Sequence, residues 1–282
     1  MNTNSISGRL FKSSLAQWGI ISLAAICVLP LFFILYYIIA SGIKVIDWSF
    51  LTHLPKPVGE TGGGIANAIT GTLIIVIVAS VMAVPFGVLS GFFLYEYKNN
   101  RLSRWAGVCV DALHGIPSIV IGIVAYFWLV KPMGGFSGIS GSLALAVMML
   151  PVVIRSTEET LNSLPPNLRE AAMGLGMPLH KIMSRVLLPC GFGGIISGAL
   201  LAVARVAGET APLLFTAFGN PFMNADMSQP MQTLPLLIFN YAMSPYTSWQ
   251  ELAWGAAFIL LSLVLLLNLI TKIITHKWKI QL

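Results

Sequence analysis

The residues best suited to chemistry lie in the apolar segment 204–214, ARVAGETAPLL. Arg205 and Glu209 are four positions apart, so on a continuous helix their side chains share a face and can pair. A charge at membrane depth is costly unless it faces protein or water. The planar guanidinium of Arg205 offers parallel N–H donors that suit two oxygens of a tetrahedral oxyanion, and Glu209 would tune it. The alternative is an ion-paired staple between helices.

Thr210 and Pro212 follow directly in the sequence. Proline removes a backbone donor and interrupts a helix, which frees carbonyl groups near the charged pair. Broken helices are tolerated at membrane depth where they line a cavity or contact other protein. The segment therefore predicts a helix break beside Arg205. Prolines at 85, 117 and 151 predict weaker irregularities in other apolar segments.

A second set of polar residues interrupts other apolar segments. Asp111 and His114 are three positions apart and could bond on one helix face, as a local polar clasp or, with less support, as a proton relay. Glu158 and Glu159 are adjacent and point in different directions, which argues against a paired acid and base. We expect them to mark a helix end.

Motifs of soluble catalysts are absent from the sequence. It has no GxxxxGKS/T loop to bind ATP and no HExxH zinc motif, so we expect neither enzyme activity, metal nor cofactor. The glycines at 62–64 have no following Lys-Ser/Thr and indicate a flexible approach to a helix. The three cysteines are an odd count, with Cys27 and Cys109 in apolar runs, which indicates small apolar side chains rather than a disulfide framework.

The composition indicates lipid as the solvent. Of 282 residues, 56% are hydrophobic and 9% are charged, against about 25% charged in a soluble domain, and the mean hydropathy is +0.84. Disorder requires low hydrophobicity, so it is excluded. The net charge of +6 does not form a basic face, which excludes nucleic acid as a partner.

Six segments supply the roughly 20 apolar residues that a membrane-spanning helix requires. They are residues 18–43, 66–95, 106–130, 139–154, 188–218 and 252–274, the fourth continuing past Arg155 towards Thr160. The first is too long for the apolar region of a signal peptide and is expected to remain as an anchor. The sequence thus predicts an all-α polytopic membrane protein.

The distribution of Lys and Arg predicts the orientation. Twelve of the 16 lie in the N-terminal segment, the second and fourth connections and the tail, three lie on the other side, and Arg205 lies within a span. Because cytoplasmic loops carry the excess of Lys and Arg, both termini are predicted to be cytoplasmic. The external segment 219–251 has no Lys or Arg and could lie along the outer interface, with Tyr246 and Trp249 at headgroup level.

The cytoplasmic connection 162–187 predicts structure of its own. After a Pro-Pro pair, residues 168–175 read as a short helix, glycines at 174 and 176 permit a bend, and residues 179–188 form a second amphipathic piece that leads to Pro189. Such a projection suits a docking partner, although an ordered interhelical loop would look the same.

The same connection carries a recognisable pattern. Glu170, Ala171 and Ala172 are followed after three residues by Gly176 and after nine more by Val186-Leu187-Leu188-Pro189. This resembles the EAA loop of ABC-importer permeases, EAA-x3-G-x9-I-x-LP, with Val186 in place of Ile. The resemblance implies that Glu170, Ala171, Ala172 and Gly176 belong to a coupling helix that docks on a separate ATPase subunit.

Further motifs narrow the resemblance to the PstA-type permease of phosphate-specific ABC importers. They are GGI at 63–65 with AIxGTL at 68–73, GIPSIV at 115–120, LPVVIR at 150–155 with TEE at 157–159, and GETAPLL at 208–214. In that family the arginine matching Arg205 is implicated in phosphate passage, so the resemblance implies a pathway that includes Arg205, Glu209 and Thr210. It also implies a type I ABC-importer permease fold with six transmembrane helices in a bacterial inner membrane.

The family further implies a homologous PstC-type permease subunit, two ATPase subunits and an external phosphate-binding protein as partners. We expect a cytoplasmic segment at 1–17, a permease domain at 18–274 with the coupling loop at about 162–189, and a cytoplasmic tail at 275–282. Three alternatives remain open: a permease for sulfate, molybdate or phosphonate, a PstC-type subunit, and a stand-alone proton-coupled carrier using Asp111, His114 and Glu209.

Overall fold

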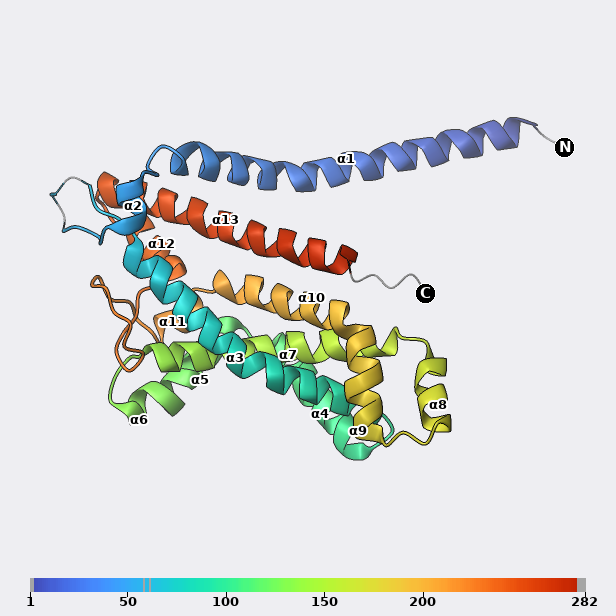
Figure 1. Cartoon of the computed structure of the whole chain (residues 1–282). Coiled ribbons are helices and arrows are strands. Elements are labelled where there is room, and N and C mark those ends of the chain that lie inside the picture. The colour runs from blue at the N-terminus through green and yellow to red at the C-terminus, as the bar shows by residue number, and fades with distance from the viewer. Residues whose placement is uncertain (1–2, 58, 61, 278–282) are drawn as a thin grey trace.

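The computed structural model describes residues 3–57, 59–60 and 62–277, with side chains described from residue 13 to residue 275 of these ranges. The described residues form helices, with the longest irregular connection between Leu214 and Leu234, and one isolated bridge between Phe218 and Met231 is their only β-type pairing. Figure 1 shows the long helices running between two ends of the molecule. The predicted all-α fold is confirmed.

Within the part of the chain that the structure describes, five helical segments are long and apolar enough to cross a membrane. They are α1 (Thr3–Gly42), α3 (Ala66–Glu96), α7 (Gly138–Asn162), the continuous run of α9 (Leu179–Ile182), η2 (Met183–Leu187) and α10 (Leu188–Ala207), and α13 (Thr247–Lys277). α1 extends the first predicted span through residues assigned to the N-terminal segment. Residues 1–2 of that segment and 278–282 of the predicted tail lie outside the described residues.

The predicted span at 106–130 is not one helix. α4 (Arg101–Gly115) ends before Pro117, and the chain continues as α5 (Ser118–Ala125), η1 (Tyr126–Val130) and α6 (Lys131–Met133) after a bend of 102°. Ile116 adopts an extended conformation because the ring of the following proline disfavours the helical one. Counted as one broken span, this pair brings the total to the predicted six.

Two π-helical turns show how other prolines are accommodated. η1 ends two residues before Pro132, and η2 ends two residues before Pro189. A π turn shifts the backbone hydrogen bonding by one residue, so that the helix continues although proline has no N–H to donate. Consequently Pro189 does not interrupt the fifth span, and the predicted second piece at 179–188 forms its first turns. Pro85 and Pro151 also lie inside the continuous helices α3 and α7.

The fifth span is shorter than the predicted 188–218. α10 ends at Ala207, residues 208–210 break the helix, and α11 (Ala211–Leu214) follows with Pro212 in its first turn. Gly208 closes α10, its N–H donating to the Arg205 carbonyl at 3.3 Å. The break next to Arg205 that Pro212 predicted is therefore present, and it terminates the long helix.

The segment 219–251 contributes a buried helix to the bundle. It contains α12 (Leu234–Ala242), whose Leu234, Leu236 and Leu237 are fully buried. The N–H of Leu234 donates to Thr72 Oγ1 of α3 at 2.8 Å. Trp249 stacks on Tyr241 with ring centroids 4.6 Å apart. α12 is thus packed against the bundle, and the position of Tyr246 and Trp249 at headgroup level stays a prediction.

The glycines at 62–64 join an ordered turn rather than the predicted flexible approach. They follow the short helix α2 (Trp48–Thr52), and Gly64 N–H donates to the Leu54 carbonyl at 3.1 Å. The next residue, Ile65, donates to the Phe50 carbonyl at 2.9 Å. A Cβ at Gly64 would lie 2.5 Å from the carbonyl oxygens of Phe50 and His53, so glycine is required for this close approach.

The centre of the bundle is the packing of α3 against α7. A Cβ at Gly87 would meet Val153 at 2.7 Å, and one at Gly91 would meet Thr157 at 2.6 Å, so these glycines let the two backbones approach closely. The buried core around them joins side chains of α3, α7, α10 and α11: Ile75, Ala79, Ala83, Leu145, Met149, Val153, Ala202, Val206 and Leu213.

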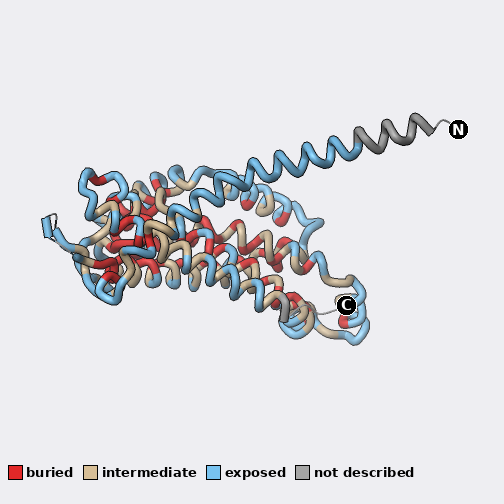
Figure 2. Tube along the Cα trace, turned by 90° about the horizontal axis from the view of Figure 1, so that it is seen from above, coloured by how far each residue is buried: buried red, intermediate tan, exposed pale blue. Residues whose placement is uncertain are grey.

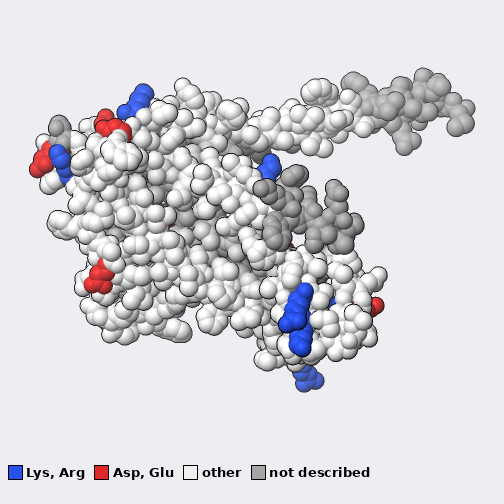
Figure 3. All heavy atoms as spheres, viewed as in Figure 1, with Lys and Arg blue, Asp and Glu red and all other residues white. Residues whose placement is uncertain are grey.

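The surface between the two ends is apolar. Figure 3 shows charged side chains gathered at the ends of the helices, with an uncharged band between them. Figure 2 shows α1 as a largely exposed helix that extends away from the other helices, and it meets α13 where Tyr37 and Trp254 pack edge to face, 5.1 Å apart. Exposed apolar residues in this band are suited to lipid or to another membrane subunit.

Candidate functional site

Arg205, Glu209 and Thr210 are brought together by the break between α10 and α11. Arg205 lies in the last turn of α10, and its Nε is 4.0 Å from Glu209 Oε1. The Glu209 side chain is 20% exposed and that of Arg205 49% exposed, so the guanidinium is open to solvent or to a ligand. The predicted pair is present, although Glu209 comes from the break and not from a shared helix face.

The break is supported by the other broken span. Gly122 of α5 faces α11, and a Cβ there would lie 2.8 Å from Pro212 Cα and 3.2 Å from the Phe215 ring. Thr210 occupies the cap position before α11, and its carbonyl accepts the Leu214 N–H at 3.1 Å. Two interrupted segments therefore pack on each other next to Arg205, where non-helical backbone is tolerated only against protein or water.

The predicted coupling loop forms the helix α8 (Pro166–Gly174) at one end of the molecule (Figure 1). Glu170 and Ala171 are exposed, whereas Ala172 is 5% exposed. Ala172 packs with side chains of α3, α7, α9, η2 and α10, namely Phe92, Leu161, Ile182, Leu187 and Ile195. Gly176 has φ +72°, a left-handed conformation that ends a helix and favours glycine. The motif thus presents Glu170 outward and fixes α8 through Ala172 and Gly176.

Arg169 was not recognised in the sequence. Its guanidinium binds both carboxylate oxygens of Glu96, the last residue of α3, with Nε to Oε2 at 3.3 Å and a shorter contact from Nη2 to Oε1. The hydrogen bond with Glu96 is the main cause that raises the pKa of Arg169 above its ordinary value. α8 is therefore joined to α3 by a bidentate ion pair.

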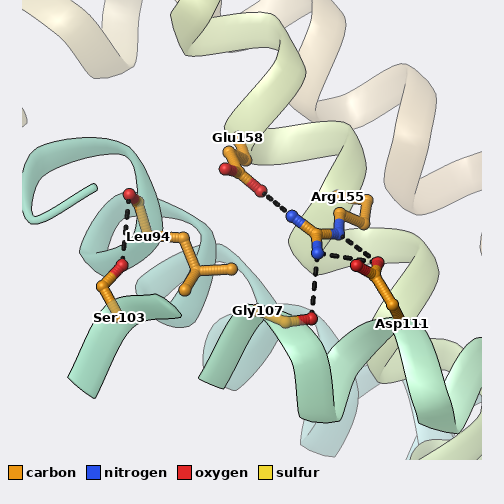
Figure 4. Close-up of polar contacts among 6 residues, drawn as sticks. All are labelled: Leu94, Ser103, Gly107, Asp111, Arg155 and Glu158. Carbon is orange, nitrogen blue, oxygen red and sulfur yellow. Dashed lines mark hydrogen bonds and ion pairs between the residues drawn. The ribbon is translucent and has the colours of Figure 1, made fainter. Parts of the chain in front are cut away.

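Arg155 was likewise predicted only as a charge near a helix end, yet it joins α4 to α7 (Figure 4). Its Nε donates to Asp111 Oδ1 at 2.9 Å and its Nη2 donates to the Gly107 carbonyl at 2.9 Å, both on α4. Its Nη1 donates to Glu158 Oε2 at 2.6 Å on α7 itself. Asp111 therefore takes part in a polar clasp with Arg155, and the structure shows no bond between it and His114 among the described side chains.

The described side chains contain no group of three or more His, Cys, Asp or Glu placed to hold a metal ion. The polar groups that the structure does gather are the Arg205 break, the Arg155 clasp and the Arg169 pair. All three rely on guanidinium groups, which bind carboxylates and other oxyanions by the same paired donors.

Comparison with known proteins identifies the family. The family described as "Binding-protein-dependent transport system inner membrane component" matches residues 83–280. The chain is 41% identical over 250 residues to the phosphate transport system permease protein PstA of Yersinia pestis, covering 88% of this chain and 85% of that protein. It is 36% identical over 271 residues to the phosphate transport system permease protein PstA 1 of Mycobacterium tuberculosis (strain H37Rv), covering 94% and 88%.

Solved structures show the same fold. A chain of the MetNI methionine ABC transporter in an inward-facing conformation superposes with a TM-score of 0.66 at 20% identity, covering 76% of this chain and 96% of that chain. An amino acid ABC transporter with histidines gives a TM-score of 0.55 at 19% identity, covering 75% and 94%. The expected type I permease fold is confirmed. The chain belongs to the family of binding-protein-dependent transport system inner membrane components and, within it, to the PstA-type permeases.

Proposed function

We propose that this chain is the permease subunit of an ATP-driven phosphate importer in the bacterial inner membrane. The observation that carries the proposal is the identity of 36–43% to permeases named for phosphate transport, over more than four fifths of the chain. The half-exposed Arg205 in a broken span supports an anionic substrate. The chain has no nucleotide-binding loop, so ATP hydrolysis belongs to a partner subunit.

We infer four partner chains from this function: a homologous PstC-type permease, two ATPase subunits and an external phosphate-binding protein. The apolar exposed faces of α1 and α13 offer area for the second permease or for lipid. The outward Glu170 and Ala171, together with the exposed Met173 and Leu175, offer a surface for the ATPase. This arrangement places α8 and both termini in the cytoplasm, in agreement with the distribution of Lys and Arg.

Transport would proceed by alternating access. ATP binding closes the two ATPase subunits, the coupling helices move with them, and the paired permeases open outward to receive phosphate; hydrolysis resets them inward. Arg205 replaces part of the hydration of phosphate with charge-assisted hydrogen bonds, and Thr210 lines the same break. Glu209, 4.0 Å from Arg205, partly neutralises the empty site, which keeps it from holding phosphate too tightly.

A proton-coupled carrier built on Asp111, His114 and Glu209 has less support. The Asp111 carboxylate accepts from Arg155 Nε at 2.9 Å, and among the described side chains no hydrogen bond joins it to His114, so the first two members of such a relay are not connected. Glu209 lies beside a different guanidinium, that of Arg205. Neither carboxylate is placed as a free proton acceptor.

The function is tested by labelled phosphate uptake in a strain that lacks this gene. We expect wild type to restore ATP-dependent uptake and Arg205→Ala to reduce it by about 100-fold, the loss expected for charge-assisted bonds to the moving ion. Arg205→Lys should recover only part, because an ammonium lacks the fork of donors. Blue-native electrophoresis checks that the variants assemble. Normal uptake by an assembled Arg205→Ala complex would remove Arg205 from the pathway.

A further inference from the structure

The coupling helix α8 has two kinds of side chain. Glu170, Ala171 and Met173 point away from the bundle and are exposed. Arg169 and Ala172 point inward, Ala172 into the cluster around Phe92 of α3 and Arg169 onto the Glu96 carboxylate. The inward face attaches α8 to the end of α3, a helix that lies about 70 residues earlier in the chain.

The ion pair between Arg169 and Glu96 is largely shielded from solvent on the side of the carboxylate. The Glu96 side chain is 8% exposed and that of Arg169 33% exposed, and both carboxylate oxygens accept from one guanidinium. A carboxylate so far removed from water depends on its cation, so separation of the pair would leave a buried charge without a partner. Among the described residues, this is the one ion pair that links α8 to a membrane-spanning helix.

α3 continues from this attachment to the opposite end of the bundle (Figure 1). It packs along α7 through Gly87 and Gly91, where the backbones are too close to slide independently. Its Ile75 and Ala79 share the buried core with Val206, the residue next to Arg205. A displacement of α8 that reaches α3 therefore reaches the break at Arg205 through packed side chains.

We propose that Arg169 and Glu96 form a strut that makes α8 and α3 move as one body, so that movement of the ATPase is passed to α3 and not only along the chain into α10. Both are positioning residues: neither touches phosphate or nucleotide. The inference rests on the proposed function for its role in transport, whereas the rigid joint between α8 and α3 can be measured without any substrate.

The substrate-free test is a distance measurement in the assembled complex. Spin labels are placed at Asn167→Cys on α8 and Val81→Cys on α3, both exposed positions, after the three native cysteines are changed to alanine. The distance between the labels is measured without nucleotide and with ATP and vanadate. With Arg169 and Glu96 intact, we expect the two distances to be equal. In Arg169→Gln, we expect them to differ. A wild-type distance that changes between the states would overturn the proposal.

The transport test uses the same complex in lipid vesicles. Arg169→Gln and Glu96→Gln should each lower the phosphate moved per ATP hydrolysed by about tenfold, within the range of coupling free energies between sites, while the ATPase still co-purifies. The exchanged pair, Glu96→Arg with Arg169→Glu, should recover most of that loss. Arg185→Gln, at an exposed arginine of η2, is the control.

Two outcomes contradict the strut while leaving the proposed function intact: single variants that keep the wild-type ratio, and an exchanged pair no better than either single variant. Absence of phosphate transport by the wild-type complex would instead contradict the proposed function, and the label distances would still decide whether α8 and α3 move together.

Discussion

The Arg155 clasp allows a quantitative prediction for the join between α4 and α7. Arg155→Met keeps an unbranched side chain as far as the position of Nε but removes the charge and all the donors. The variant leaves the Glu158 carboxylate, only 19% exposed, without its cation at 2.6 Å, and leaves the Gly107 carbonyl without its donor at 2.9 Å. The bonds to Asp111 count for less, because that side chain is 65% exposed and solvent weakens exposed ion pairs.

The size of the effect follows from these exposures. Hydrogen bonds to charged groups contribute about 1.5–3 kcal/mol, and loss of one partner of a fully buried pair costs more. Arg155 is 30% exposed, so we expect about 2 kcal/mol. A chain of this size shifts its Tm by about 2 °C per kcal/mol, which predicts a fall of about 4 °C.

The assay is thermal unfolding of the purified protein in detergent. Samples are heated to a series of temperatures, and size-exclusion chromatography measures how much folded protein remains in each. Arg155→Lys should lose about half as much as Arg155→Met, because the ammonium keeps the charge but lacks the planar fork of donors that reaches acceptors on both α4 and α7. Arg185→Met, which removes an exposed arginine, is the control and should change Tm by less than about 1 °C. Equal shifts for Arg155→Met and Arg185→Met would refute the clasp.

Three further predictions concern packing and pH. Thr72→Val removes the acceptor of a buried N–H of α12 and should cost about 1–3 kcal/mol; limited proteolysis within 219–233 should become faster, and an unchanged rate would contradict the anchor. Gly198→Ala forces a methyl group onto Ser156 of α7 and should lower the free energy of unfolding by about 1–3 kcal/mol. Gly115→Ala is the control and should not lower it, because the space around Gly115 is open; equal Tm values for the two variants would contradict this packing. Because its pKa is raised, Arg169 contributes stability at every pH below its ordinary pKa and loses it only above that value. The Tm difference between wild type and Arg169→Gln should therefore stay constant from about pH 7 to 10, and a steady decline over that range would contradict the sign.

Local patterns predicted the elements that depend on nearby residues. Hydropathy located the spans because each apolar run must satisfy its own backbone in lipid. The Pro-Pro pair and the glycines at 174 and 176 located α8 and its bend, because proline starts helices and glycine readily ends them; Gly176 adopts the left-handed conformation typical of a helix end. Arg205 stays a prediction as a pathway residue, which rests on the cost of placing a charge within an apolar segment.

The contacts that the sequence did not predict join residues that lie far apart in the chain. Arg155 contacts Asp111 across 44 positions and Arg169 contacts Glu96 across 73, so no local period could pair them. The packing of α12 was not predicted, because the bond that anchors it comes from Thr72 of α3, 162 positions away. The 102° bend at Pro117 exceeded the weak irregularity that was predicted, since a proline permits a bend but tertiary packing sets its angle.

The central claim is that this chain carries phosphate, and substrate competition in a defined system tests it most directly. The complete importer in lipid vesicles, supplied with ATP inside, with binding protein and labelled phosphate outside, should accumulate label. Excess unlabelled phosphate should abolish the accumulation, and sulfate, molybdate or phosphonate should leave it unchanged. Accumulation that one of these other oxyanions suppresses as well as phosphate does, or that persists without ATP, would contradict the account.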